Sequence, residues 1–329
     1  MNPAAFLADL EAKPAALRRL AAVLADGDAW AALPVARASS VLLLGMGSSA
    51  YAAGVAAARM RAAGVPAVAE LASSDLLPAV DGDTLVVAIS AGGSSRETAL
   101  AVARLAGRAP VVLLTNRPDG PLAAHAHAVV PLHAGEETGG VACRTFQHTL
   151  LLLLALGERL AARPGASRGD APDRSDVATL AELAARASEH LLAGRDRWLP
   201  RLRDLLLGAD GTYLAAPARR LSSAQQGALM LREGPRRAAT GCETGDWSHV
   251  DVYLTKTLDY RLLLFAGSRW EDELLRWTGE RASTVVAVGG DVPGSALTVR
   301  YPGDDVDDVR LVSEVLVAEL LAADAWLRP

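Results

Sequence analysis

Two short turns rich in glycine and serine carry the residues best suited to chemistry. The first, GMGSS at residues 45–49, follows an apolar run at residues 41–44, and the second, SAGGSS at residues 90–95, follows the run VVAI at residues 86–89. Glycine lets the backbone approach a ligand closely. Serine hydroxyls and the amides of a helix N-terminus donate hydrogen bonds to an anion, which the helix dipole also favours. The two turns therefore predict a phosphate site built from uncharged donors.

A purely structural role explains either turn alone, because Gly-x-Gly after a strand is common in α/β proteins and Ser48 would then only cap a helix. Two such turns in one chain favour an anion site over capping. The chain has no GxxxxGK[ST] motif, and no GxGxxG followed by an acidic residue in the right place. Neither ATP nor a dinucleotide is therefore expected.

The elements that must position these turns alternate along the chain. Short apolar runs predict strands at residues 41–44, 67–71, 84–89, 111–114, 128–131, 212–215, 238–242, 261–265, 284–288 and 297–299. Helical spacing of apolar residues predicts helices at residues 3–27 (which Pro14 can divide in two), 48–63, 95–106, 145–162, 178–195 (with a possible continuation to 207), 222–233, 270–278 and 307–326. Such alternation is typical of an α/β protein whose parallel sheet is covered on both faces.

The order of elements repeats after residues 163–177, a stretch rich in Pro, Gly, Ser and charge. We interpret this repeat as a duplicated doubly wound domain. The predicted organisation is an N-terminal helix at residues 1–30, a first domain at 31–164, a linker at 165–177 and a second domain at 178–329.

Composition excludes several classes of protein. Of the 329 residues, 51% are hydrophobic, which excludes a wholly disordered chain. The net charge of −5 gives no reason to expect nucleic acid or an anionic membrane as partner. Cys143 and Cys242 alone make neither a disulfide framework nor a cysteine zinc site. The longest apolar run, residues 150–156, is too short for a membrane helix, and no signal-peptide pattern opens the chain. A cytoplasmic protein is expected.

His125, His127 and His133 with Glu136 are candidates for a metal site, because a His-x-His pair on a strand places both rings on one face. The surrounding stretch is rich in Ala and Val, which favours an ordinary strand. We expect no metal and no other cofactor.

Two further segments bear on function. The stretch from Ala134 to Cys143 reads AGEETGGVAC, and GALMLRE at residues 227–233 is followed by DWSH at residues 246–249. Together with the two turns, these segments resemble, in order, the tandem SIS (sugar isomerase) domain family, and specifically the isomerase half of glutamine:fructose-6-phosphate amidotransferase. The sixteen-residue spacing from Glu233 to His249 also matches. The similarity runs from about residue 35 to the C-terminus.

The resemblance implies two tandem three-layer αβα domains, each with a five-stranded parallel sheet. It assigns the phosphate to serine hydroxyls and to the backbone of the two turns, namely Gly47, Ser48, Ser49, Ser90, Ala91, Gly92 and Ser95. It places Val141 and Cys143 near the sugar. Glu233 falls on the enolisation base, and His249 on a ring-opening histidine supplied by the neighbouring subunit, so a homodimer is implied.

Aldose–ketose interconversion through an enediol needs one base to move a proton between adjacent carbons, and a group that opens the ring. A half-buried Glu233 with a raised pKa suits the first role, and the imidazole of His249 suits the second. The structural alternatives stay open: Glu233 as a solvated helix residue and His249 as a hydrogen-bonded core histidine. Cys143 has no base beside it in the sequence, so small polar packing near the sugar is expected for it.

The chain also departs from the family. Met230 replaces a lysine, and the C-terminal tail that carries the imine-forming lysine is not expected, which leaves Lys13 and Lys256 as the two lysines. The glutaminase domain and its N-terminal cysteine are not expected either. Gly92 stands where a serine is usual, and the second-domain turn at residues 215–218 contains no glycine or serine. That domain is therefore expected to bind no phosphate.

The expected function is a sugar-phosphate isomerase, or an isomerising deaminase or aminotransferase-like enzyme, acting on a hexose 6-phosphate or an amino-sugar 6-phosphate. One alternative is a fructosamine-6-phosphate-type deglycase, whose acid–base chemistry needs no enzyme lysine. The other is a non-catalytic sugar-phosphate sensor, which the missing lysines favour.

Overall fold

The computed structural model describes residues 1–31, 38–162 and 176–328. The chain divides by its contacts into two compact units. One, which we call the sheet-1 unit, comprises residues 16–136 and 144–181, and the other, the sheet-2 unit, comprises residues 1–15, 137–143 and 182–329. Each unit is described by itself.

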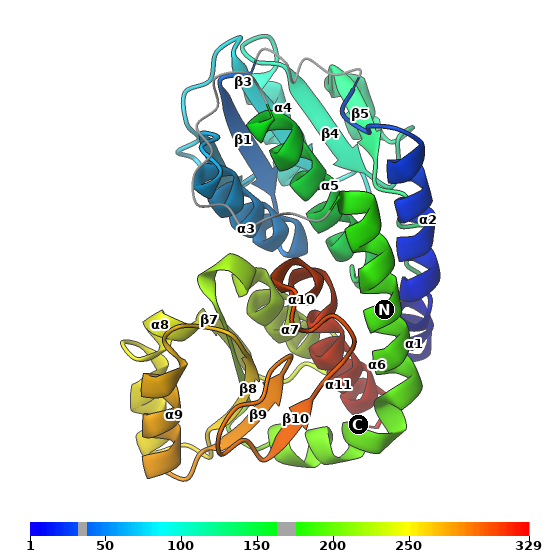
Figure 1. Cartoon of the computed structure of the whole chain (residues 1–329). Helices are drawn as coiled ribbons and strands as arrows, with labels where there is room; N and C mark the ends of the chain where they lie inside the picture. The colour runs from blue at the N-terminus through cyan, green and yellow to red at the C-terminus, as the bar shows by residue number, and fades with distance from the viewer. Residues whose placement is uncertain (32–37, 163–175, 329) are drawn as a thin grey trace. The chain divides into compact units, whose positions relative to one another are not determined.

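The sheet-1 unit is built on a five-stranded sheet whose paired strands all run parallel, in the order β2-β1-β3-β4-β5. Its strands are β1 (Ser40–Gly45), β2 (Ala67–Leu71), β3 (Thr84–Ile89), β4 (Val111–Thr115) and β5 (Ala128–Pro131). Its helices are α2 (Lys13–Asp26, whose first three residues belong to the sheet-2 unit), α3 (Ser48–Ala62), α4 (Arg96–Leu105), α5 (Arg144–Ala161) and the 3-10 helix η2 (Pro121–His125). Helices α3 and α5 pack together beside β1, whereas α4 and η2 pack together next to β3 (Figure 1).

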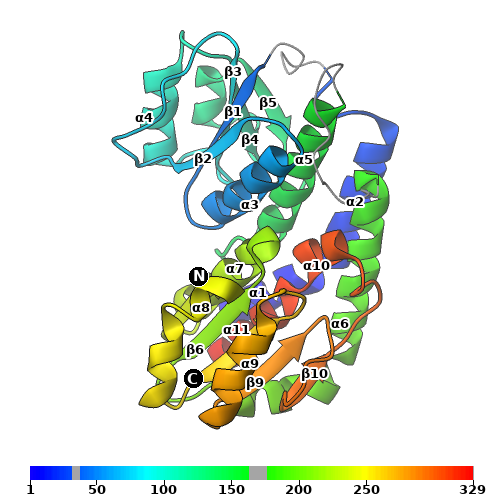
Figure 2. The same cartoon turned by 60° about the vertical axis from the view of Figure 1, so that its left-hand side comes forward.

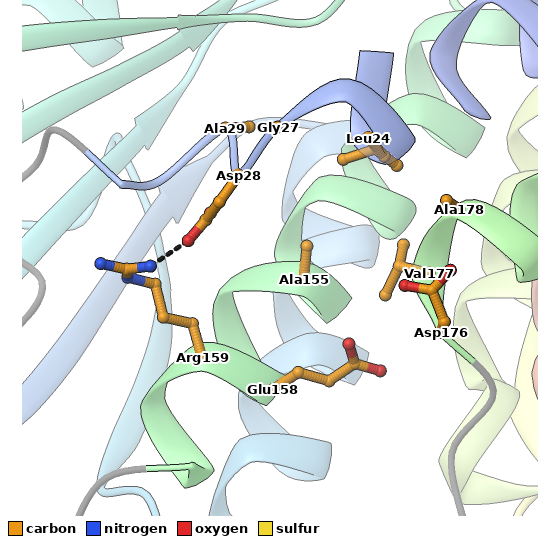
Figure 3. Close-up of a pocket in the computed structure, with 10 residues that line it drawn as sticks. All are labelled: Leu24, Gly27, Asp28, Ala29, Ala155, Glu158, Arg159, Asp176, Val177 and Ala178. Atoms are coloured by element: carbon orange, nitrogen blue, oxygen red, sulfur yellow. Dashed lines mark hydrogen bonds and ion pairs between the residues drawn. The ribbon is translucent and has the colours of Figure 1, made fainter. Parts of the chain in front are cut away.

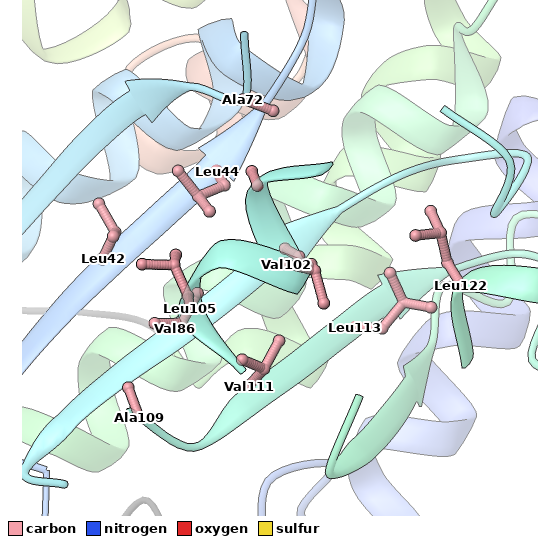
Figure 4. Close-up of a cluster of buried hydrophobic side chains, with 12 residues drawn as sticks. Leu42, Leu44, Ala72, Val86, Val102, Leu105, Ala109, Val111, Leu113 and Leu122 are labelled. Carbon is pink, nitrogen blue, oxygen red and sulfur yellow. The ribbon is translucent and has the colours of Figure 1, made fainter. Parts of the chain in front are cut away.

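The central strands of this sheet are apolar on both faces, as expected for a parallel sheet covered by helices. Every residue of β3 and of β4 is buried. On the α4 side, Val102 and Leu105 pack on side chains of β1, β3 and β4 (Figure 4). This packing fixes the carboxyl ends of β1 and β3, from which the two serine turns emerge.

The sheet-2 unit repeats the design with strand order β10-β9-β8-β6-β7, again all parallel. Its strands are β6 (Thr212–Ala216), β7 (Ala239–Glu243), β8 (Arg261–Phe265), β9 (Thr284–Val288) and β10 (Leu297–Val299). Its helices are α1 (Pro3–Glu11), α6 (Val177–Leu206, whose first turn belongs to the sheet-1 unit), α7 (Leu221–Glu233), α8 (Thr244–Trp247), α9 (Glu271–Glu280), α10 (Asp307–Ser313), α11 (Val315–Leu327) and the 3-10 helices η3 (Ala218–Arg220) and η4 (Asp251–Lys256). Helix α7 packs against α11, and α9 against α8 and η4 (Figure 2).

The predicted fold class is confirmed, because the chain forms two doubly wound parallel sheets flanked by helices. Every run predicted as a strand is a strand. The helix predicted at residues 3–27 is divided near Pro14, as that residue indicated, with the break at Ala12. The helix predicted as continuous at 307–326 is divided at Glu314. Most of the predicted linker at residues 165–177 lies outside the described residues, since 163–175 are not described. Within the described part of the chain, no helix is both long and apolar enough to span a membrane.

Candidate functional site

The two serine turns lie side by side at the topological switch point of the first sheet. Strands β1 and β3 pair in parallel with Leu44 opposite Ala88, so both turns leave the same edge of the sheet. The chain leaves β1 toward β2 on one side and leaves β3 toward β4 on the other. Doubly wound sheets bind ligands in the crevice at this point, outside the carboxyl ends of the strands.

The first turn is shaped by glycines that no other residue replaces easily. A Cβ at Gly45 would lie 2.8 Å from the Ser49 carbonyl carbon, so a side chain there would collide with the start of α3. Gly47, the residue before α3, has φ 51° and ψ −126°, a conformation that favours glycine. Ser48 and Ser49 form the first turn of α3 and are half-buried, and the helix has no side-chain cap. Both hydroxyls thus stand at the helix end that favours anions.

The second turn is fixed by the end of β4. The Asn116 amide donates to the Ala91 carbonyl at 3.1 Å, and the Gly93 amide donates to the Ser90 carbonyl at 3.1 Å. Gly93 has φ 62°, and a Cβ there would lie 3.2 Å from Thr115 Oγ1. Ser90 is only 6% exposed, and its hydroxyl has no hydrogen-bond partner among the described residues. A buried hydroxyl with unused hydrogen-bonding capacity is suited to hold a ligand at this position.

Ser95 acts as the N-cap of α4. Its Oγ accepts hydrogen bonds from the Thr98 amide at 3.2 Å and the Thr98 hydroxyl at 3.1 Å, and it donates to Glu97 Oε2 at 3.0 Å. The Glu97 carboxylate has a lowered pKa because it accepts a backbone hydrogen bond and the one from Ser95. Ser95 therefore has the capping role that was the structural alternative, and phosphate binding by it stays a prediction.

Glu233 ends α7 and is half-buried. Burial raises the pKa of its carboxyl, while Arg232 opposes the shift. The following Gly234 lies against α11, where a Cβ would be 2.9 Å from Trp326 Cε3, so the end of α7 is held tightly. Glu233 is thus partly shielded from solvent, and its role as a general base stays a prediction.

Val141 and Cys143 lie on the segment Glu137–Cys143, which the contacts place in the sheet-2 unit with Glu233. Both side chains are buried, at 3% and 0% exposure. Burial and nearby Glu137 raise the pKa of the Cys143 thiol well above its usual range, so this cysteine is no nucleophile at neutral pH. The side chains of Val141 and Cys143 are therefore not accessible at the surface of this unit.

His249 follows the short helix α8 and is exposed. Its backbone amide donates to the Asp246 carbonyl at 2.8 Å, and Glu243 caps the helix by accepting from the Gly245 and Asp246 amides. The alternative of a core histidine is wrong for this residue. Ring opening by His249 stays a prediction.

The two lysines are held differently. Lys13 is fully buried in the sheet-2 unit, and its Nζ pairs with Glu319 Oε2. Lys256 is exposed, with its Nζ 5.5 Å from the centroid of the Tyr253 ring. A buried, ion-paired ammonium is not an amine free to form an imine.

The histidines considered for a metal are occupied otherwise or exposed. His127 Nδ1 accepts a hydrogen bond from the Val111 amide at 3.0 Å, while His125 and His133 are exposed. Over the described ranges, no three or more His, Cys, Asp or Glu side chains are grouped as a metal site.

In the second sheet, a carboxylate of the chain itself lies at the position that corresponds to the second serine turn of the first sheet. The loop after β8 corresponds to the loop after β3, and there Glu271 Oε1 accepts from the amides of Gly267 and Ser268, the latter at 2.8 Å. Past the end of β6, the buried side chain of Arg220 forms two ion pairs. Its Nε lies 3.0 Å from Glu314 Oε1, and its guanidinium also pairs with Asp307. Internal carboxylates thus take the donors that a ligand phosphate would need.

A cavity of about 210 Å³ lies elsewhere in the sheet-1 unit, and none of the predicted site residues lines it (Figure 3). It is bordered by the ends of α2 and α5 and the start of α6, with Asp28 and Arg159 paired at its rim. Its carboxylates, Asp28, Glu158 and Asp176, form no metal-binding group. We assign no function to it.

Comparison with known proteins agrees with this geometry. Residues 35–159 match the family model of the SIS domain. The chain is 29% identical over 226 residues to the isomerizing glutamine–fructose-6-phosphate aminotransferase of Aeropyrum pernix, an alignment that covers 68% of this chain and 36% of that protein. The chain thus spans about a third of the length of such relatives.

Two solved structures share the fold over nearly the whole chain. The C-terminal domain of glucosamine-fructose-6-phosphate aminotransferase from Francisella tularensis superposes with a TM-score of 0.80 at 16% identity, covering 98% of this chain and 96% of that one. Tagatose-6-phosphate ketose/aldose isomerase from Escherichia coli superposes with a TM-score of 0.76 at 15% identity, covering 98% and 93%.

Proposed function

We propose that this chain, whose residues 35–159 match the SIS-domain family model, binds a hexose 6-phosphate or an amino-sugar 6-phosphate and isomerises it through an enediol, with or without release of nitrogen. The matched segment, residues 35–159, contains both serine turns. The relatives named above act, by their names, on fructose 6-phosphate and tagatose 6-phosphate. A phosphorylated ketose is the ligand class common to them.

The proposal is supported above all by the position of the two serine turns, which lie side by side at the switch point of the first sheet. Ser48 and Ser49 at the start of α3 offer neutral donors at one sheet edge. The hydroxyl of Ser90, which has no partner within the described ranges, lies at the same edge. A phosphate dianion needs several donors and gains from a helix N-terminus. The second sheet has its own carboxylate at the corresponding loop, so we propose one phosphate site per chain.

In the proposed reaction, the Glu233 carboxylate removes a proton from the carbon next to the carbonyl and returns it to the neighbouring carbon. The carbonyl oxygen takes up a proton as the enediol forms, and the neighbouring hydroxyl gives up a proton as the new carbonyl forms, so an isomerisation gains and loses no atom. Release of nitrogen would in addition consume one water molecule and free one ammonia. A carboxyl with its pKa raised by burial is a stronger base than an exposed one. This route needs no enzyme lysine, which fits the buried ion pair of Lys13.

We also propose a homodimer in which His249 serves the site of the neighbouring copy. His249 is exposed, and Val250 and Tyr253 beside it are 55% and 61% exposed. Apolar side chains exposed around a polar group are typical of an interface. Light scattering measures the state, and a mixture of inactive Glu233→Gln and His249→Ala chains should regain activity only if the two residues act across copies.

The second candidate is a non-catalytic sensor of the same ligands, which the burial of Lys13 and the exposed position of Lys256 favour. A fructosamine-6-phosphate-type deglycase is the enzyme alternative, because cleavage of a glycated amine needs acid–base groups alone. Both alternatives retain the proposed phosphate site. A sensor would move no proton at the carbons next to the carbonyl, whereas a deglycase would cleave the glycated amine.

Proton exchange with solvent separates these candidates. The protein is incubated in D₂O with fructose 6-phosphate, glucose 6-phosphate and glucosamine 6-phosphate, and NMR follows deuterium at C1 and C2. We expect exchange with wild type and none with Glu233→Gln. Glu280→Gln is the control, because Glu280 is an exposed glutamate that ends α9 in the same way. Saturable binding without exchange of any sugar would support the sensor and contradict catalysis.

A further inference from the structure

The segment Glu137–Cys143 is fixed by helices that lie far from it in the sequence. It connects β5 to α5, two elements of the sheet-1 unit, yet its contacts place it with α1 and α7 in the sheet-2 unit. It carries Val141 and Cys143, the residues predicted to lie near the sugar.

Helix α1 holds the segment at Gly139. The Gly139 amide donates to Asp9 Oδ2 at 2.7 Å, and its carbonyl accepts from the Asn2 amide at 3.1 Å. A Cβ at position 139 would lie 2.5 Å from Phe6 Cα, so the segment lies directly on the backbone of α1. Asp9 is 4% exposed. The backbone amide and carbonyl of Gly139 are therefore both hydrogen-bonded to α1 and its N-cap residue.

Helix α7 holds the segment at Ala142. Gln226 Nε2 donates to the Ala142 carbonyl at 2.8 Å, and Gln226 is fully buried. Gln226 precedes Glu233 by seven residues, which is two turns of the same helix. The Ala142 carbonyl is thus tied to the helix that ends in the proposed base. Glu137 Oε1 closes the segment by accepting from the Cys143 amide at 2.6 Å.

Helix α1 is also linked to the end of α7. Phe6 packs against Trp326 of α11 with 6.0 Å between ring centroids, and Trp326 lies against Gly234, the residue after Glu233. The segment Glu137–Cys143 and the backbone at the end of α7 are therefore held by one continuous set of contacts within the sheet-2 unit. Nothing in the sequence pattern marks Gln226 or Asp9 for this role, because the partners lie 84 and 130 positions away.

We propose that Gln226 and Asp9 are positioning residues that hold the backbone of Glu137–Cys143 in register with Glu233 and so set the affinity for the sugar part of the ligand. This inference rests on the proposed function. The two residues act through the segment and leave the phosphate contacts of the serine turns unchanged.

The test compares two probes, fructose 6-phosphate and inorganic phosphate, by calorimetric titration. Gln226→Met removes the donor at similar volume, and Gln225→Met on the half-buried neighbouring position is the matched control. Asp9→Leu removes the acceptor for Gly139, whereas Asp9→Asn retains an oxygen that can accept. Loss of one buried hydrogen bond of this kind corresponds to roughly a threefold to thirtyfold change in an equilibrium constant.

We expect Gln226→Met and Asp9→Leu to weaken binding of fructose 6-phosphate roughly tenfold, with the dissociation constant for inorganic phosphate unchanged. Asp9→Asn and Gln225→Met should bind both probes like wild type. Equal losses for both probes, together with a lower melting temperature, would show a merely structural role and overturn the inference, as would unchanged binding of fructose 6-phosphate. If wild type itself binds inorganic phosphate but no sugar phosphate, the proposed function fails instead.

Discussion

Lys13 Nζ and Glu319 Oε2 form an ion pair in which neither side chain is exposed to solvent. Burial raises the pKa of Glu319, while the attraction and hydrogen bond of Lys13 oppose that shift. The pair joins the start of α2 to α11 across 306 positions of sequence. Lys13 thus acts as a structural cation in the core of the sheet-2 unit.

Removing one member of this pair should be costly, because it leaves the other charge buried and unpaired. We expect Lys13→Met to lower the free energy of unfolding by about 3–5 kcal/mol, as measured by urea denaturation. The double change Lys13→Met with Glu319→Leu should regain most of the loss, since an apolar pair of similar volume replaces a buried ion pair well. A single variant as stable as wild type would contradict this view of the pair.

Because of the buried ring of His148, we expect the folded protein to lose stability in acid. Its Nδ1 donates to the Leu132 carbonyl at 2.8 Å, and burial lowers the pKa of the ring to about 4. The folded state therefore binds fewer protons than the unfolded state between about pH 6.5 and pH 4, and stability falls as the pH falls through this window. The full effect of one such group is about 3 kcal/mol.

His148→Gln removes the titrating ring but can still donate to the Leu132 carbonyl. The stability difference between wild type and this variant should therefore change with pH between pH 7 and pH 4.5, in favour of the variant at the lower pH. Parallel urea midpoints for the two proteins over that range would show that His148 is not the group responsible.

For Glu233 we expect the opposite trend, a loss of stability as the pH rises. Because burial raises the pKa of its carboxyl in the folded state, its contribution is fully present below the usual carboxyl range and is lost as the pH rises through the folded-state value. Glu233→Gln, which cannot ionise, should therefore melt higher than wild type at pH 7 and about equally at pH 4. Thermal scans at both pH values measure this. A variant that melts lower at pH 7 would mean that the ionised carboxylate is stabilised by the fold.

Ser95 allows its two roles to be separated. Ser95→Ala should cost about 1 kcal/mol of stability, because the Thr98 amide loses its cap acceptor. Ser95→Asn can still cap α4 and should keep the stability of wild type. If Ser95 only caps the helix, both variants bind fructose 6-phosphate like wild type at a temperature where each is folded. Weaker binding by Ser95→Asn at full stability would instead assign it to the phosphate.

The two sheets and the serine turns could be predicted because their signals are local. Apolar runs at 84–89 and 111–114 mark buried strands, and the glycines of the turns are needed by backbone conformation within a few residues. Pro14 likewise marks the division between α1 and α2. Glu314 shows the limit of this reasoning, since a periodic pattern alone does not reveal where one helix ends and another begins.

The rest of the candidate site depends on contacts that no local pattern records. The burial of Lys13 against Glu319, and the attachment of Glu137–Cys143 to α1 and α7, join residues that are distant in sequence. The same is true of the second sheet, where residues 215–218 lack glycine and serine but the donors after β8 are bound by Glu271, which sequence reasoning did not single out.

Calorimetric titration of fructose 6-phosphate into wild type and into the double variant Ser48→Ala with Ser90→Ala tests the central claim most directly. We predict saturable binding to wild type, no binding of unphosphorylated fructose, and at least a roughly tenfold weaker affinity for each hydroxyl removed. Equal affinity of the double variant and wild type for fructose 6-phosphate would contradict a phosphate site at the paired turns of the first sheet.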